Sequence, residues 1–223
     1  MAPADAGVVA PPDLPPLERT SLAGSGPVQL SGALVEQEGG DPVRASRVSI
    51  TESELRGVTL TAEHAPGLAL RDVILRDCGL SNIDGREGEI ARVEIHHSQL
   101  VGFGCSRARV RDLRVLDSSL QLASFAGARL QRVVFEGVQL SEASFEGARL
   151  EAVAFIDCRL AGADFSGATL KGCAIRGSSL DDIVGIASLR GVRMPWPEVL
   201  GSAAAMAAAF GIEIEIEIEI ETS

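Results

Sequence analysis

Residues 118–167 read, in blocks of five, SSLQL ASFAG ARLQR VVFEG VQLSE ASFEG ARLEA VAFID CRLAG ADFSG. The third residue of every block is leucine or phenylalanine, and the two types alternate. The first residue is always small or β-branched, and glycine often ends a block. A fixed period of this kind is the sequence signature of a repeat architecture.

The same frame runs without insertion from residue 50 to residue 180 and gives 27 central positions. A period of five matches neither the 3.6 of a helix nor the 2.0 of a strand. We predict that each unit makes one short extended side and a turn, with the centre and the residue two before it pointing inward. Four sides then close a coil of 20 residues. The clearest core centres are Leu120, Phe125, Leu130, Phe135, Leu140, Phe145, Leu150, Phe155, Leu160 and Phe165.

The pattern small-x-Leu/Phe-x-x resembles the pentapeptide-repeat motif A(D/N)LXX. The resemblance covers about 60% of the chain, although Asp or Asn before the centre, as at Asp164, is uncommon here. It implies an all-β fold, a right-handed quadrilateral parallel β-helix (solenoid), which we place at residues 46–185.

Sorting the centres by a 20-residue coil gives four sides. Side one has its centres at 60, 80 and so on to 180, side two at 65 to 165, side three at 50 to 170, and side four at 55 to 175. Weak centres occur only on side two, at Ala65, Gly85 and Cys105. We expect a distorted or bulged face there, with Ile83 and Phe103 taking over the inward role.

Both ends of such a rod expose apolar edges and need caps. We expect residues 1–45 to hold a flexible start and an N-terminal cap. Residues 186–211 should hold a C-terminal capping helix that begins at Pro195 and ends near Gly211. Its apolar residues are either a cap alone or also a homodimer contact, a role that such caps serve in the resembled family: Trp196, Leu200, Met206 and Phe210.

Residues 212–223 form an Ile/Glu tail with the strict alternation of a strand. The tail either pairs with a partner strand or is an expanded dipeptide repeat without function. Its five glutamates carry nearly half of the net charge of −11, so the repeat body is close to balanced.

The compartment is suggested by several features together. The N-terminus lacks the basic and apolar regions of a secretory signal, no run of 18 apolar residues exists, and the four cysteines show no CxxC spacing. We therefore expect a reduced, cytoplasmic protein with no membrane partner.

No set of residues predicts catalysis, a cofactor or a metal site. His96 and His97 fall on outward positions, His64 lies apart from them, and no cysteine joins them at ligand spacing. The cysteines fit small inward positions as apolar fillers. We expect no enzyme activity.

Arg109, Arg129 and Arg149 recur at 20-residue spacing on outward positions of side three. They form either a solvated face of mixed charge or a basic stripe for an acidic partner.

Two functions remain open. The first is a scaffold or interaction module with an unidentified protein partner. The second is implied by the resemblance: some members of the family mimic duplex DNA, bind DNA gyrase or a related topoisomerase and confer resistance to quinolone-like inhibitors. Neither function involves direct binding of nucleic acid.

Overall fold

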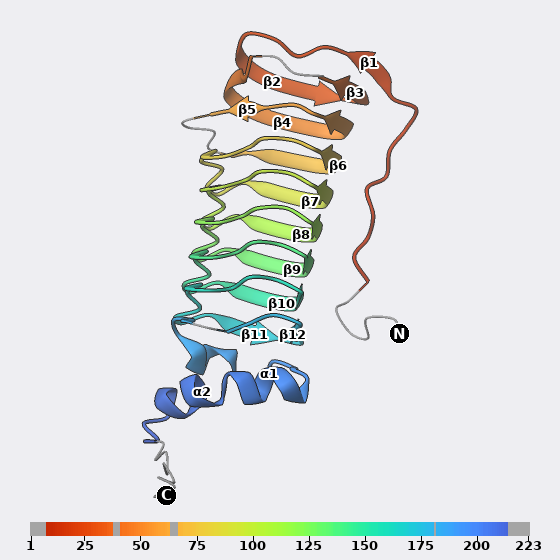
Figure 1. Cartoon of the computed structure of the whole chain (residues 1–223). Helices are drawn as coiled ribbons and strands as arrows, with labels where there is room; N and C mark the ends of the chain where they lie inside the picture. The colour runs from red at the N-terminus through yellow and green to blue at the C-terminus, as the bar shows by residue number, and fades with distance from the viewer. Residues whose placement is uncertain (1–7, 38–40, 63–66, 181, 214–223) are drawn as a thin grey trace, which may run out of the picture.

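The computed structural model describes residues 8–37, 41–62, 67–180 and 182–213. Over these residues the chain coils into a right-handed, four-sided parallel β-solenoid, as the sequence pattern predicts (Figure 1). A stack of long strands forms sides three and four: β4 (Val43–Arg56), β6 (Ala69–Arg76), β7 (Glu89–His96), β8 (Arg109–Leu116), β9 (Arg129–Glu136) and β10 (Arg149–Ile156).

The register confirms the coil of 20 residues. In β9 and β10, Leu130 pairs with Leu150 and Phe135 pairs with Phe155, always 20 positions apart. Sides one and two carry isolated bridges instead of long strands, such as the bridge from Ser124 to Ser144. Each centre therefore stacks on a residue of the same side in the next coil.

With the exception of Ala62, each described residue that lies two positions after a centre from Ile50 to Leu180 has a left-handed backbone conformation. At Gly137 the backbone φ is +65°, a region that glycine enters without the steric cost of a Cβ atom. This requirement explains the recurrent glycines of the sequence.

The sheet extends upstream of residue 46, where we placed the start of the β-helix. Three strands precede β4: β1 (Glu18–Thr20), β2 (Ser25–Ser31) and β3 (Ala33–Glu36). Leu30 pairs with Ile50 and Val35 with Leu55, so both lie on the five-residue frame. The frame positions between Val35 and Ile50 hold Gly40 and Ala45, two small residues that interrupt the row of large apolar centres.

The core is a column of small identical layers. The ten clearest centres, Leu120 to Phe165, are all at most 2% exposed. Phe145 stacks on Phe125 and Phe165, with ring centroids 5.2 and 4.9 Å apart. Rings of the opposite side, Phe135 and Phe155, meet it edge-on across the interior. Phenylalanine on two opposite sides thus fills the interior with few aromatic residues.

Side two stays regular at Gly85 and Cys105, contrary to the expected distortion. Both backbone N–H groups donate to the next coil, Gly85 to Gly104 and Cys105 to Ser124. The space above Gly85 is taken by the buried Leu68, whose Cδ2 would lie 2.8 Å from an added Cβ. A large residue nearby therefore compensates for the small centre. Ala65 lies outside the described residues.

The C-terminal end closes with β11 (Thr169–Lys171), β12 (Ala174–Arg176) and the 3-10 helix η1 (Ile186–Leu189). The single helix predicted after Pro195 is instead two short ones, α1 (Trp196–Gly201) and α2 (Ala203–Ala209). They meet at Ser202, whose φ of −103° and ψ of 4° depart from helical values. Within the described part of the chain, no helix is long and apolar enough to cross a membrane. Of the predicted tail, all but Ile212 and Glu213 lies outside the described residues.

Candidate interaction surfaces

The outer surface of side three is the first candidate surface. Arg109, Arg129 and Arg149 are the first residues of β8, β9 and β10, and each pairs directly with the next in the register. All three are exposed. Within the described structure, none of the three side chains has an ion-pair or hydrogen-bond partner. They form the ladder that the sequence predicted.

Other charges surround this ladder. Glu89 pairs with Arg71 at 3.4 Å and with Arg111 at 3.2 Å, and Glu151 approaches Lys171 at 3.8 Å. The outward positions of β6 to β11 on side three thus hold six basic and two acidic side chains, and we call this surface the basic face. Its basic residues are Arg71, Arg109, Arg111, Arg129, Arg149 and Lys171.

Stacking like charges costs free energy. Strands that pair directly lie roughly 4.8 Å apart, and two unit charges about 4 Å apart in water repel by about 1 kcal/mol. Long exposed arginines can splay and reduce this cost, but an anionic group placed between them would remove it. The basic face is therefore suited to bind carboxylates.

A second charged feature runs along the corner between sides three and four. Asp72, Arg92, Asp112 and Arg132 occupy the left-handed position of successive coils, and we call them the corner ladder. Arg132 donates from Nε and Nη2 to the two oxygens of Asp112, both at 2.7 Å, and Arg92 binds Asp72 in the same way. The arginine of the next coil thus orients each carboxylate.

These contacts shift the carboxyl groups. The hydrogen bonds from Arg92 hold the pKa of Asp72 below its usual value, and those from Arg132 do the same for the pKa of Asp112. Burial opposes both shifts but does not reverse them. Both side chains therefore remain ionised acceptors at neutral pH.

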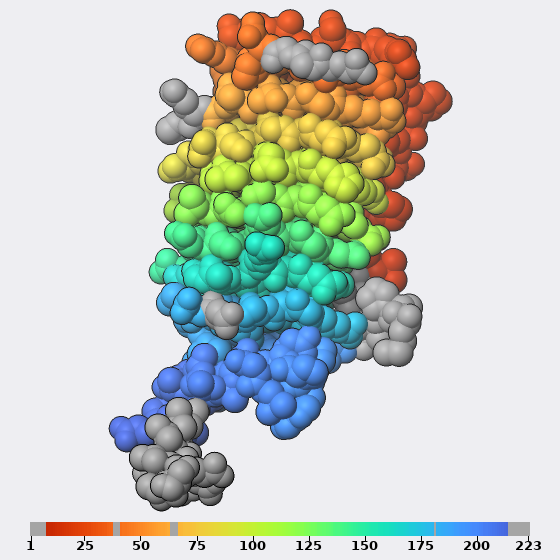
Figure 2. Space-filling model, viewed as in Figure 1, coloured from red at the N-terminus to blue at the C-terminus, as the bar shows by residue number. Residues whose placement is uncertain are grey.

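An N-terminal arm, residues 8–17, lies along this corner. It follows the side of the rod upward to β1 (Figure 1), and its atoms edge the stack of coils in Figure 2. The N–H of Ala10 donates to Asp112 Oδ1 at 3.2 Å, and that of Asp13 donates to Asp72 Oδ1 at 3.0 Å. We expected a flexible start, yet the described part is anchored. The alternation of acid and base at 72, 92, 112 and 132 is a signal in the sequence that could have revealed the corner ladder.

The cysteines are buried, free thiols. Burial raises the pKa of Cys105 to about 12 and that of Cys158 to about 11, so neither is a thiolate at neutral pH. Among the described residues, no three His, Cys, Asp or Glu side chains gather as metal ligands. His96 contacts Glu94 at 3.1 Å on side four.

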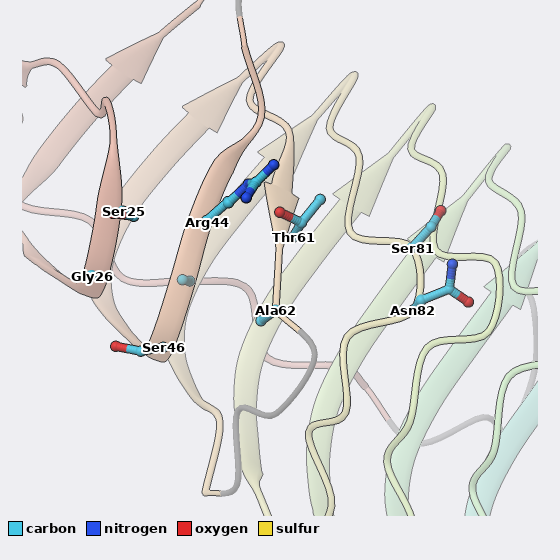
Figure 3. Close-up of a pocket in the computed structure, with 9 residues that line it drawn as sticks. Ser25, Gly26, Arg44, Ser46, Thr61, Ala62, Ser81 and Asn82 are labelled. Atoms are coloured by element: carbon cyan, nitrogen blue, oxygen red, sulfur yellow. The ribbon is translucent and has the colours of Figure 1, made fainter.

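An open groove of about 890 Å³ lies near the N-terminal end of side two. Figure 3 shows Arg44, Thr61, Ser81 and Asn82 along it, with Ser25 on the neighbouring strand. Hydroxyl and amide groups dominate this lining, and Arg44 is the one charged residue among the described lining residues.

The predicted cap residues divide between two environments. Met206 packs against the core and, with Phe210, lines a cavity of about 320 Å³ between η1 and the helices. Trp196, Leu200 and Phe210 are 69%, 57% and 70% exposed. Only part of the predicted apolar face therefore covers the last coil.

A family model described as a pentapeptide repeat region matches residues 116–184, the part of the rod with the most regular frame. This stretch of the chain therefore matches a pentapeptide repeat region. This confirms the resemblance drawn from the alternating centres.

Solved pentapeptide-repeat structures are similar to this protein at low identity. A trypsin-treated variant of QnrB1, a plasmid-mediated fluoroquinolone resistance protein, is 18% identical with a TM-score of 0.47; the match covers 87% of this chain and 97% of that one. HetL, a pentapeptide repeat protein involved in heterocyst differentiation regulation in the cyanobacterium Nostoc sp. strain PCC 7120, is 18% identical with a TM-score of 0.28, covering 80% of this chain and 87% of that one. No curated protein matches this chain significantly. At these identities the likeness concerns the fold alone.

Proposed function

We propose that this protein is a non-enzymatic interaction scaffold that docks an acidic protein partner on its basic face. The observation that carries the proposal is the ladder of Arg109, Arg129 and Arg149. These side chains are exposed, directly stacked and unpaired in the described structure, whereas most other arginines of the rod contact an acid.

The rod supplies the rigidity that such a surface needs. Each arginine is attached to a strand whose neighbours fix it on both sides, so the spacing of the charges changes little on binding. A partner with carboxylates on an extended segment would gain charge-assisted hydrogen bonds without the cost of ordering the scaffold.

The test compares two triple variants for binding a fluorescent oligoglutamate peptide at low salt. Replacing Arg109, Arg129 and Arg149 with Gln should weaken binding at least tenfold and flatten its salt dependence. The control replaces three exposed arginines elsewhere with Gln and so changes the net charge equally: Arg47, Arg159 and Arg190. Equal losses in both variants would reject the basic face as the site.

A second candidate is a DNA mimic that binds gyrase, which the net charge of −11 favours. A protein that mimics duplex DNA needs a continuous acidic stripe along the rod in place of the phosphates. Asp72, Asp112 and Glu54 are instead engaged by arginines, and side three carries more basic than acidic groups. A gyrase supercoiling assay with and without a quinolone decides: neither inhibition nor protection at micromolar protein would reject this candidate.

We also propose that the exposed Trp196, Leu200 and Phe210 form a homodimer contact at the C-terminal end of the rod. Their exposed apolar area supports this assignment. Sedimentation should show a dimer that Leu200→Glu dissociates, and a monomer at all concentrations would contradict the contact. The free buried thiols support a reducing, cytoplasmic location.

A further inference from the structure

The N-terminal arm and the corner ladder share a repeat distance. The two carboxylates that accept from the arm, Asp72 and Asp112, lie two coils apart, which is roughly 9.6 Å at 4.8 Å per coil. The two donors, Ala10 and Asp13, are three residues apart. In a polyproline II segment, three residues span about 9.3 Å. The spacing of the two donors therefore equals about one turn of a polyproline II helix.

The composition of the arm suits this geometry. Residues 8–17 read VVAPPDLPPL, and four of these ten residues are proline. Proline favours the polyproline II conformation and has no N–H to leave unpaired against the rod. The N–H groups of Ala10 and Asp13 have the spacing of the two carboxylates that accept from them.

The ladder is built without the arm. Each carboxylate is already held by a two-point contact from an arginine of the next coil, and Asp112 Oδ1 accepts from both Arg132 Nε and the Ala10 N–H. These contacts from Arg92 and Arg132 fix the orientation of Asp72 and Asp112 without any contribution from the arm. The site is therefore preorganised for an extended ligand.

The arm makes few contacts with the rod. Within the described structure its polar contacts with the ladder are two hydrogen bonds, Val8 is 90% exposed, and none of residues 8–17 is fully buried. A ligand in the same chain has an effective concentration of the order of millimolar, so even a weak contact is populated. A separate ligand with better contacts can displace it.

We propose that the corner ladder is a binding site for a proline-rich, polyproline II segment of a partner protein, and that the N-terminal arm occupies it as a competitor within the chain. The ligand is recognised by backbone N–H groups three residues apart, which donate to Asp112 and Asp72. This site is distinct from the basic face and does not depend on the function proposed for it.

The experiment uses the full chain and a fluorescent synthetic peptide with the sequence of residues 8–17 as the probe. Replacing both Ala10 and Asp13 of the chain with Pro removes the two donors of the arm, together with the Asp13 carboxylate that attracts Arg92, and leaves the residues of the ladder unchanged. By fluorescence anisotropy this variant should bind the probe at least tenfold more tightly than the wild-type chain does. Val8→Pro, at a position 90% exposed, is the control and should behave as the wild type.

A second probe tests the recognition itself without altering the rod. The same peptide with Pro at the positions of Ala10 and Asp13 keeps its conformation but lacks both donors, and it should bind the arm variant at least tenfold more weakly. Equal binding of the two peptides, or no binding of the first at millimolar concentration, would overturn the proposal. Sedimentation should give the same mass for wild type and arm variant; loss of a dimer in the variant would assign the site to a second copy of the chain and overturn the partner.

Discussion

Replacing Phe145 tests the layered core most directly, because this ring is fully buried and contacts four others. It stacks on Phe125 and Phe165 with interplanar angles of 7° and 10°, and it meets Phe135 and Phe155 at 72° and 86°. Truncation therefore removes both a large apolar side chain and the centre of a ring stack.

The magnitude follows from these contacts. Phe→Ala in a core costs about 3–5 kcal/mol, and each aromatic pair is worth about 0.5–1.5 kcal/mol beyond burial. We expect Phe145→Ala to lose about 4–5 kcal/mol of unfolding free energy, a large part of the about 5–15 kcal/mol of a typical domain. Phe145→Leu keeps most of the volume and should lose about 1–2 kcal/mol, mainly from the stack.

Urea unfolding followed by circular dichroism measures both losses. Leu122→Ala, at a residue 56% exposed, is the control and should change stability by no more than about 0.5 kcal/mol. A loss below about 1 kcal/mol for Phe145→Ala would refute the layered packing.

Two further predictions concern the turns and the corner. Because the pKa values of Asp72 and Asp112 are lowered in the folded state, their contribution to stability is complete above the unfolded value near pH 4 and is lost as the pH falls below it. The free energy of unfolding of the double variant Asp72→Asn/Asp112→Asn should therefore decrease less than that of the wild type as the pH falls through this range. An equal decrease in both proteins would contradict the pairing. Gly147→Ala should cost about 1 kcal/mol from its φ of +61° alone, and Gly137→Ala should cost more because its Cβ would lie 2.5 Å from Asp117 Oδ1. Denaturation midpoints measure both, and Asp117→Gly should abolish the difference between them.

Much of the fold was predictable from the sequence because each layer is built from local choices. The alternating leucine and phenylalanine centres predict the coil, since a residue can stack only on its counterpart 20 positions later. The first coil at Leu30 and Val35 was not predicted because the next two positions of the frame hold the small Gly40 and Ala45, which hide an otherwise unbroken period. On side two the predicted inward role of Ile83 and Phe103 is confirmed by their burial, whereas the predicted distortion is wrong because Leu68 fills the space at Gly85 from another side.

The candidate surfaces were less predictable from the sequence than the fold. The arginine ladder could be predicted because its spacing equals the coil. The absence of ion-pair partners for these arginines could not be predicted, since it depends on where Glu89 and Glu151 direct their carboxylates. The position of the N-terminal arm was also invisible, because Ala10 and Asp112 are 102 residues apart and share no periodic relation.

The sequence by itself determined the five-residue repeat, the four sides and the inward centres, because period and residue size leave one way to bury the apolar positions. Only the tertiary structure decided which charges are paired, where the C-terminal helix breaks and which corner the arm follows. Those outcomes depend on contacts between distant segments, and their free energies are small compared with that of the core.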